Sequence, residues 1–220
     1  MSKQASSRLT KREHARAERQ RQKLTWNLVL LGGAAAVVLV VVWYIAATSR
    51  PGALPGEIAV PDEGQAHVRA FNTDGTPTGA RITYTTYPPA SGTHYGDLVA
   101  PWGVYTAAQP LEPDLAAGTY DLEGIYLHSL EHGGVVILYQ CAAAECAPLE
   151  QKFTALYDKA APPPGCPDAK IAVLPYDKTL PTPMVALAWA HQLNLSAFDE
   201  AALLRWYQRF VNRGPEQVQC

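Results

Sequence analysis

The stretch YLHSLEHGGVVILY, residues 126–139, organises the domain and holds its densest group of reactive side chains. Its second half, Val135–Tyr139, is a continuous apolar run of strand length, which predicts a buried central strand. Its first half places two histidines and a glutamate directly before a pair of glycines. Because glycine ends a helix readily, and a further one, Gly124, lies just upstream, we expect only about one helical turn in front of the strand.

Strand and helix patterns flank this stretch. Apolar, aromatic and β-branched residues predict further strands at 67–71, 80–87, 171–174 and 184–189. Helical spacing predicts a helix over 148–158 that starts at Pro148, and a last helix that Ser196 can cap and Gly214-Pro215 ends. Runs of strands without regular strand–helix alternation indicate an α+β fold: a single extracytoplasmic domain with a mainly antiparallel sheet and two amphipathic helices, preceded by one transmembrane helix.

The transmembrane helix is predicted over residues 24–48. Leu28–Ala47 is an uncharged apolar run of 20 residues, which as a helix would rise ~30 Å and match the hydrocarbon thickness of a bilayer. The head before it, residues 1–23, carries eight basic and two acidic residues; it is therefore +6, and because the whole chain is −2, the remainder is −8. The positive-inside rule puts the head in the cytoplasm and the C-terminal domain outside the cell membrane. The competing interpretation, a cleaved signal peptide, has a shorter basic lead and a shorter apolar region.

The remaining organisation follows from this anchor. Residues 49–64 contain several prolines and glycines with little periodicity and are expected to form a linker, and residues 65–216 to form the extracytoplasmic domain. As partners we expect the lipid membrane and another membrane or extracytoplasmic protein. We do not expect nucleic acid, because no aromatic residue is interleaved with the basic residues of the head.

All four cysteines, Cys141, Cys146, Cys166 and Cys220, follow the predicted anchor. An even number of cysteines in an exported domain is typical of disulfide bonds, and four cysteines allow three pairings. We prefer Cys141–Cys146 with Cys166–Cys220, because the first pair flanks a short alanine-rich loop.

Four residues are candidate metal ligands: His94, His128, Glu131 and His132. On a helix, positions i and i+4 share a face about 5–6 Å apart, so His128 and His132 can converge on one ion. Glu131 would be a third ligand, a general base or the acceptor that orients a ring, and the turn before His94 would deliver a third imidazole. The competing interpretation is that the histidine pair only stabilises the carbonyls at a helix C-terminus.

The other histidines have simpler explanations. His14 belongs to the charged head, and His67 and His191 lie in or near predicted strands. For His67 and His191 we expect partly buried, hydrogen-bonded side chains.

The spacing His-x-x-Glu-His from His128 to His132 is also that of the inverted zinc-protease motif. Such a site needs a helix long enough to hold both histidines rigidly, with the glutamate polarising a zinc-bound water. Because the flanking glycines leave about one turn, a metal-dependent hydrolase is the alternative hypothesis rather than the main one.

A group of short motifs is spread over the domain: PPASGTHY at 88–95, GVY at 103–105, HSLEHGGVV at 128–136, ALAW at 186–189, FD at 198–199 and GPE at 214–216. Together they resemble a bacterial family known as domain of unknown function 3105, over about residues 66–216. The resemblance implies a single membrane anchor followed by this domain. It also implies that His94, His128, Glu131 and His132 act as a set, but it implies no reaction.

The main hypothesis is a membrane-anchored extracytoplasmic protein that binds a metal ion, copper or zinc, because imidazoles with a carboxylate suit both metals. One alternative is a metal-dependent hydrolase that uses Glu131 as its base. The other is a non-catalytic assembly or interaction domain of a membrane complex, in which the long loop 88–118 makes the contact.

Overall fold

The computed structural model comprises two units, Met1–Gly52 and Ala53–Cys220. It describes residues 32–33, 37–40, 52–109, 111, 119–216 and 218. In the first unit, residues 32–33 and 37–40 are helical and exposed. None of the helices in the described part of the chain has both the length and the apolar character of a membrane-spanning segment. The predicted head, 1–23, and most of the predicted transmembrane helix, 24–48, lie outside the described residues.

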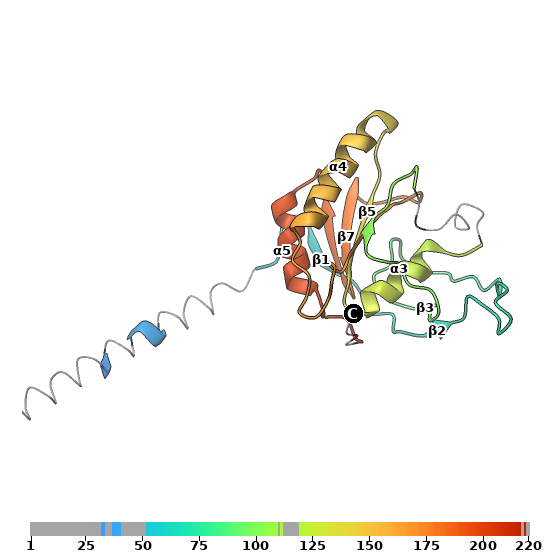
Figure 1. Ribbon diagram of the computed structural model, residues 1–220, viewed down its shortest axis with the longest axis horizontal. Coiled ribbons are helices and arrows are strands. Elements are labelled where there is room, and N and C mark those ends of the chain that lie inside the picture. The colour runs from blue at the N-terminus through green and yellow to red at the C-terminus, as the bar shows by residue number, and fades with distance from the viewer. Residues whose placement is uncertain are drawn as a thin grey trace, which may run out of the picture. The chain divides into compact units, whose positions relative to one another are not determined.

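A six-stranded sheet forms the centre of the second unit (Figure 1). Its strands, in spatial order, are β1 (Glu57–Ala59), β8 (His191–Leu195), β7 (Met184–Ala188), β5 (Val135–Tyr139), β6 (Ile171–Pro175) and β4 (Gly103–Val104). Neighbours from β1 to β5 are antiparallel, whereas β6 is parallel to both β5 and β4. The α+β fold with a mainly antiparallel sheet is therefore confirmed. A second sheet consists of two parallel strands, β2 (His67–Val68) and β3 (His94–Tyr95).

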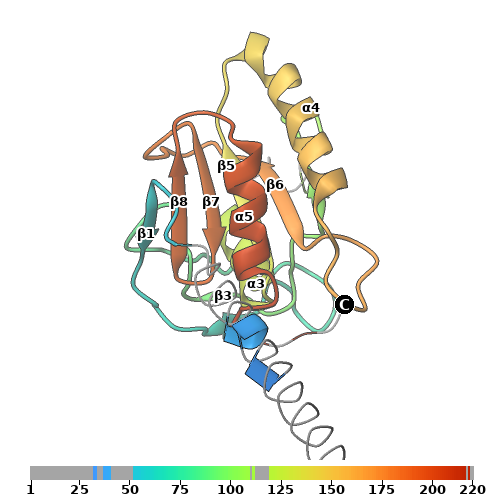
Figure 2. The ribbon, with the colours of Figure 1, turned by 90° about the vertical axis from the view of Figure 1, so that its left-hand side faces the viewer.

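Each face of the large sheet has its own hydrophobic core. Along β5, Val135, Ile137 and Tyr139 belong to one core, and Val136 and Leu138 to the other, as the alternation of side chains along a strand requires. Helices α4 (Ala143–Lys159) and α5 (Glu200–Phe210) cover the first face, and α3 (Leu122–Glu131) covers the second together with residues of β3 (Figures 1 and 2). The apolar run therefore forms a central strand buried on both sides, as predicted.

Helix α3 corrects the expectation of a single turn and of only two helices. Its ten residues include Gly124, and it is one of three helices in the described part of the second unit. Gly124 does not break the helix; it makes room for a neighbour, because a Cβ atom there would lie 2.6 Å from Cε2 of Tyr95. The glycine thus lets β3 approach α3 closely.

The predicted strand over residues 80–87 is wrong, because this segment is irregular. Two of its backbone polar groups pair with side chains. The Ile82 N–H donates to Asp121 at 2.9 Å, and the Ala80 carbonyl accepts from the Tyr95 hydroxyl at 2.8 Å. Residues of high strand propensity here serve as packing groups around β3 rather than as a ladder.

Other strands also differ from expectation. Residues 67–71 supply only the two-residue β2. β8 was not predicted, and β1 lies within residues 49–64, which were expected to be a linker. The pairing of β1 with β8 therefore extends the folded domain into that segment. The predicted strands at 171–174 and 184–189 are confirmed as β6 and β7.

The two predicted helices are present but have different ends. α4 begins at Ala143, so Pro148 lies inside it and is not its first residue. α5 is capped by Asp199 rather than Ser196, because the Asp199 carboxylate accepts a hydrogen bond from the Ala202 N–H at 2.9 Å. α5 ends at Phe210, before Gly214-Pro215.

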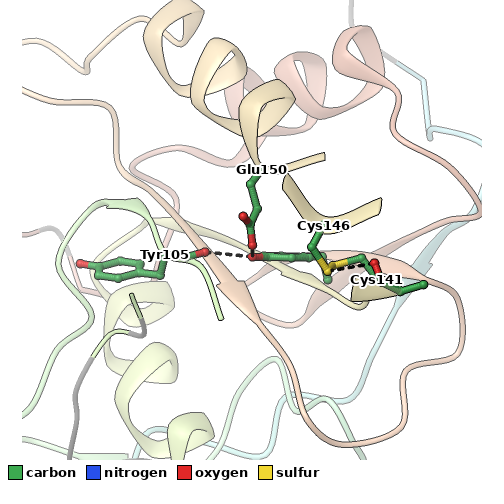
Figure 3. The surroundings of a disulfide bond; sticks show 6 residues. Tyr105, Cys141, Cys146 and Glu150 are labelled. Atoms are coloured by element: carbon green, nitrogen blue, oxygen red, sulfur yellow. Dashed lines mark hydrogen bonds between the residues drawn. A yellow bond between two sulfur atoms is a disulfide. The ribbon is translucent and has the colours of Figure 1, made fainter. Parts of the chain in front are cut away.

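The predicted disulfide Cys141–Cys146 is present, with Cα atoms 5.2 Å apart, and joins the residues after β5 to the start of α4 (Figure 3). Beside it, the Tyr139 hydroxyl lies 2.8 Å from the Glu150 carboxylate. Cys166 is disulfide-bonded as well. Its predicted partner, Cys220, lies outside the described residues.

Candidate metal centre

The C-terminal end of α3 presents three of the predicted ligands. His128 and Glu131 lie three residues apart, so they share one face of the helix, and His132 is the residue directly after it. The close packing of β3 on this helix brings a fourth, His94, to the buried carboxylate of Glu131. The Nε2 atom of His94 lies 2.9 Å from Oε2 of Glu131.

Strand β2 adds a histidine that the sequence did not indicate as a ligand. In the parallel pair β2–β3, His67 is in register with His94. The centroids of the two rings lie 4.5 Å apart in an edge-to-face arrangement. The sequence analysis assigned His67 to an ordinary strand position. No motif connects it with the histidines of α3, since only the register of two short strands places it there.

Glu131 is the centre of this cluster. Its side chain is fully buried, and Oε2 lies 3.0 Å from Nε2 of His67 in addition to the contact with His94. Its other oxygen, Oε1, is buried and has no hydrogen-bond partner among the described residues. An unpaired buried oxygen costs about 1–3 kcal/mol, and more when it is charged, so the arrangement suits a site that a cation completes.

Two of the imidazole rings are oriented by backbone carbonyls. Nδ1 of His94 lies 2.8 Å from the carbonyl of Gly92, and Nδ1 of His128 lies 2.8 Å from the carbonyl of Leu98. A carbonyl only accepts, so each Nδ1 carries the hydrogen, and in a neutral ring Nε2 is left as the ligand atom. Metal-binding histidines are commonly held in this way. Since Leu98 lies outside α3, the contact of His128 does not fit a helix-capping role.

His132 completes a second group beside the first. Its ring centroid lies 4.4 Å from that of His128, and its Nε2 lies 3.4 Å from the carboxylate of Glu216. Two sets of three side chains could each hold a metal ion, with ligand atoms within 4.8 Å of one another: His67, His94 and Glu131; and His128, Glu131 and His132. The four residues singled out from the sequence therefore lie together, and His67 joins them.

The surroundings of the cluster favour the protonation states that bind metal. It lowers the pKa of His128 and that of His132 below the ordinary value of 6.5, so both rings are neutral at pH 7. Burial raises the pKa of Glu131, but hydrogen bonds with His67 and His94 outweigh this and leave it below the ordinary 4.5. Neutral imidazoles and an ionised carboxylate are the forms that coordinate metals.

The double glycine after His132 has a packing role as well. The Gly133 carbonyl accepts from the Asn212 N–H at 2.8 Å, and a Cβ atom on Gly133 would lie 2.7 Å from the Asn212 Cα. Further along, the Glu216 N–H donates to the Glu131 carbonyl at 3.1 Å. The segment after α5 therefore packs on the end of α3 and places the Glu216 carboxylate at the site.

Fold and site together define an α+β domain with a buried histidine–carboxylate cluster on one face of its sheet. Residues 76–220, more than half of the chain, match a family described as protein of unknown function (DUF3105). The chain belongs to this family. The matched region includes all four residues predicted from the sequence, whereas His67 lies before it. A comparison with curated proteins found no match, and a comparison with solved structures found none either.

Proposed function

We propose that this domain binds a transition-metal ion, copper or zinc, through its histidine–carboxylate cluster. The proposal depends on the 2.9 Å contact between Nε2 of His94 and Oε2 of Glu131. Because the Nδ1 hydrogen of His94 is directed at Gly92, a favourable contact of Nε2 with the carboxylate needs a cation there: a second proton, which makes the contact an ion pair, or a metal ion. The second imidazole, His67, makes a metal ion suitable.

The ligand chemistry supports copper or zinc. Imidazole nitrogen with a carboxylate oxygen is typical of both, and the affinity order of divalent metals favours Cu²⁺ wherever it is present. Neither group of three contains a sulfur ligand, so Cu²⁺ suits the site better than Cu⁺.

A metal-dependent hydrolase is the second candidate, because α3 is a ten-residue helix rather than a single turn. In that mechanism Glu131 would act as general base on a metal-bound water. Its Oε2, however, contacts two imidazoles, which supports a role as a ligand rather than as a base. Metal binding without an assigned reaction is therefore the function that the geometry favours.

The metal proposal is tested on the full-length protein in detergent. The protein is stripped with a chelator, reloaded with Cu²⁺ or Zn²⁺, separated from unbound metal and measured by elemental analysis. We expect at least one ion per chain in the wild type, at least one ion fewer in His94→Ala, and no loss in His191→Gln, since His191 on β8 belongs to neither group. If the wild type holds no more metal than His94→Ala, the His94–Glu131 contact is a proton-mediated ion pair and the proposal is wrong.

We also propose that the domain is anchored outside the cell membrane by residues 24–48. The support is the uncharged apolar run behind a basic head. In bacterial spheroplasts, protease added outside should degrade the C-terminal domain and leave an N-terminal tag intact. A C-terminal domain that is protected until the membrane is lysed would contradict this topology.

A further inference from the structure

The two oxygens of Glu131 have different surroundings. Oε2 contacts the Nε2 atoms of both His67 and His94, at 3.0 and 2.9 Å. Oε1 is equally inaccessible, yet nothing in the described part of the chain hydrogen-bonds to it. One ion bound at Oε2 would leave Oε1 uncompensated, and an unpaired oxygen of a buried carboxylate is costly.

A second ligand set lies beside the first and shares this carboxylate. His128 and His132 form a group of three with Glu131, and their ring centroids are 4.4 Å apart. The hydrogen bond of His128 Nδ1 to Leu98 leaves its Nε2 for coordination. The two sets are close, because the ring centroids of His94 and His128 are 5.4 Å apart.

We propose that the cluster is a binuclear metal centre bridged by Glu131. Oε2 binds the ion held by His67 and His94, and Oε1 binds the ion held by His128 and His132. Carboxylate-bridged pairs of this type have metal–metal separations of about 3.5–4 Å. The inference rests on the proposed function, since it requires that the cluster bind metal at all.

The ligand count indicates what else such a centre binds. Each ion has three protein ligand atoms, whereas closed structural sites supply about four, so each ion keeps an open position. Two divalent ions also carry more charge than one carboxylate balances, even with Glu216 beside His132. The open positions therefore suit an anionic oxygen ligand shared by both ions, such as hydroxide or a small oxyanion.

The test is the metal stoichiometry of full-length protein loaded with Cu²⁺. We expect two ions per chain in the wild type and one in either His67→Ala or His132→Ala, because each variant removes a ligand from a different set. The His67 side chain is 43% exposed and that of His132 23% exposed, so both variants should fold, and circular dichroism checks this. His191→Gln is the matched control and should keep two ions.

An independent readout is electron paramagnetic resonance. Two Cu²⁺ ions about 3.5–4 Å apart couple magnetically. The wild type should therefore show a half-field signal that both single variants lose. One ion per chain in the wild type, with no half-field signal, would overturn the binuclear centre but leave the proposed metal site intact. No bound ion would overturn both proposals.

Discussion

Glu123 is a second buried carboxylate of α3, held by different partners from those of Glu131. It accepts hydrogen bonds from the Tyr176 hydroxyl at 2.6 Å and from Lys178 Nζ at 2.7 Å. Burial raises the pKa of Tyr176, so its hydroxyl stays protonated and donates.

Tyr176→Phe should lower the free energy of unfolding by about 1.5–3 kcal/mol, because a hydrogen bond to a buried charge is lost. Urea denaturation measures this. Tyr87→Phe, at an exposed ring, is the control and should change little; equal effects would contradict the assignment.

His191 makes stability depend on pH. Burial lowers the pKa of His191 below the ordinary 6.5. The two charged groups that act on its ring, Glu57 and Arg209, form an ion pair with each other at 2.8 Å. The native state favours the neutral ring of His191. The stability that this ring contributes to the native state is therefore complete above pH 6.5, and it is lost as the pH falls from there toward the native-state pKa. The free energy of unfolding between about pH 7.5 and pH 5 should therefore fall more steeply in the wild type than in His191→Gln. Parallel curves for the two proteins would refute this.

At the scale of elements, the contact between α3 and β3 depends on Gly124. In an exposed helix, glycine to alanine stabilises by about 1 kcal/mol. Here the new Cβ would lie 2.6 Å from the Tyr95 ring and 2.9 Å from Ile82. We expect Gly124→Ala to destabilise the domain by about 1–3 kcal/mol and to weaken metal binding, because β3 carries His94. Thermal unfolding and competition with a metal-binding dye measure both effects. The loss of stability caused by Gly124→Ala should be smaller in a Tyr95→Leu background. A Gly124→Ala protein that is more stable than the wild type would show that no clash exists.

The elements also differ in how far their sequences predict them. β5, β6 and β7 are apolar runs buried in the sheet, and α5 has an apolar stripe whose members Leu203, Tyr207 and Phe210 are all buried. In each case a local pattern matches the burial that tertiary structure imposes. Residues 80–87 have an equally good strand pattern, but they pair with side chains of β3 and of the residue before α3. Strand propensity was overruled there by these contacts with distant side chains.

At the scale of the whole molecule, the sheet separates the disulfide from the candidate metal centre. Cys141 packs against the core under α4 and α5, whereas α3 belongs to the core on the opposite face. The disulfide closes a loop with a sequence separation of 5, so removing it with Cys141→Ser and Cys146→Ser should lower the free energy of unfolding by roughly 2 kcal/mol. Metal content should not change. Denaturation and elemental analysis measure the two quantities, and loss of metal in the double variant would show that the two faces are coupled.

From the sequence alone, the central strand, the last helix, the short disulfide and the proximity of His94, His128, Glu131 and His132 could be predicted, whereas metal binding by these residues stays a prediction. Each depends on a pattern written within a short stretch: an apolar run, a helical stripe, or a spacing of histidines and glycines. Only the tertiary structure decided that His67 joins the set, that Gly124 lies inside a helix, and that Glu131 belongs to two ligand groups. These features depend on strand register and on close approach between distant segments, and neither leaves a local pattern along the chain.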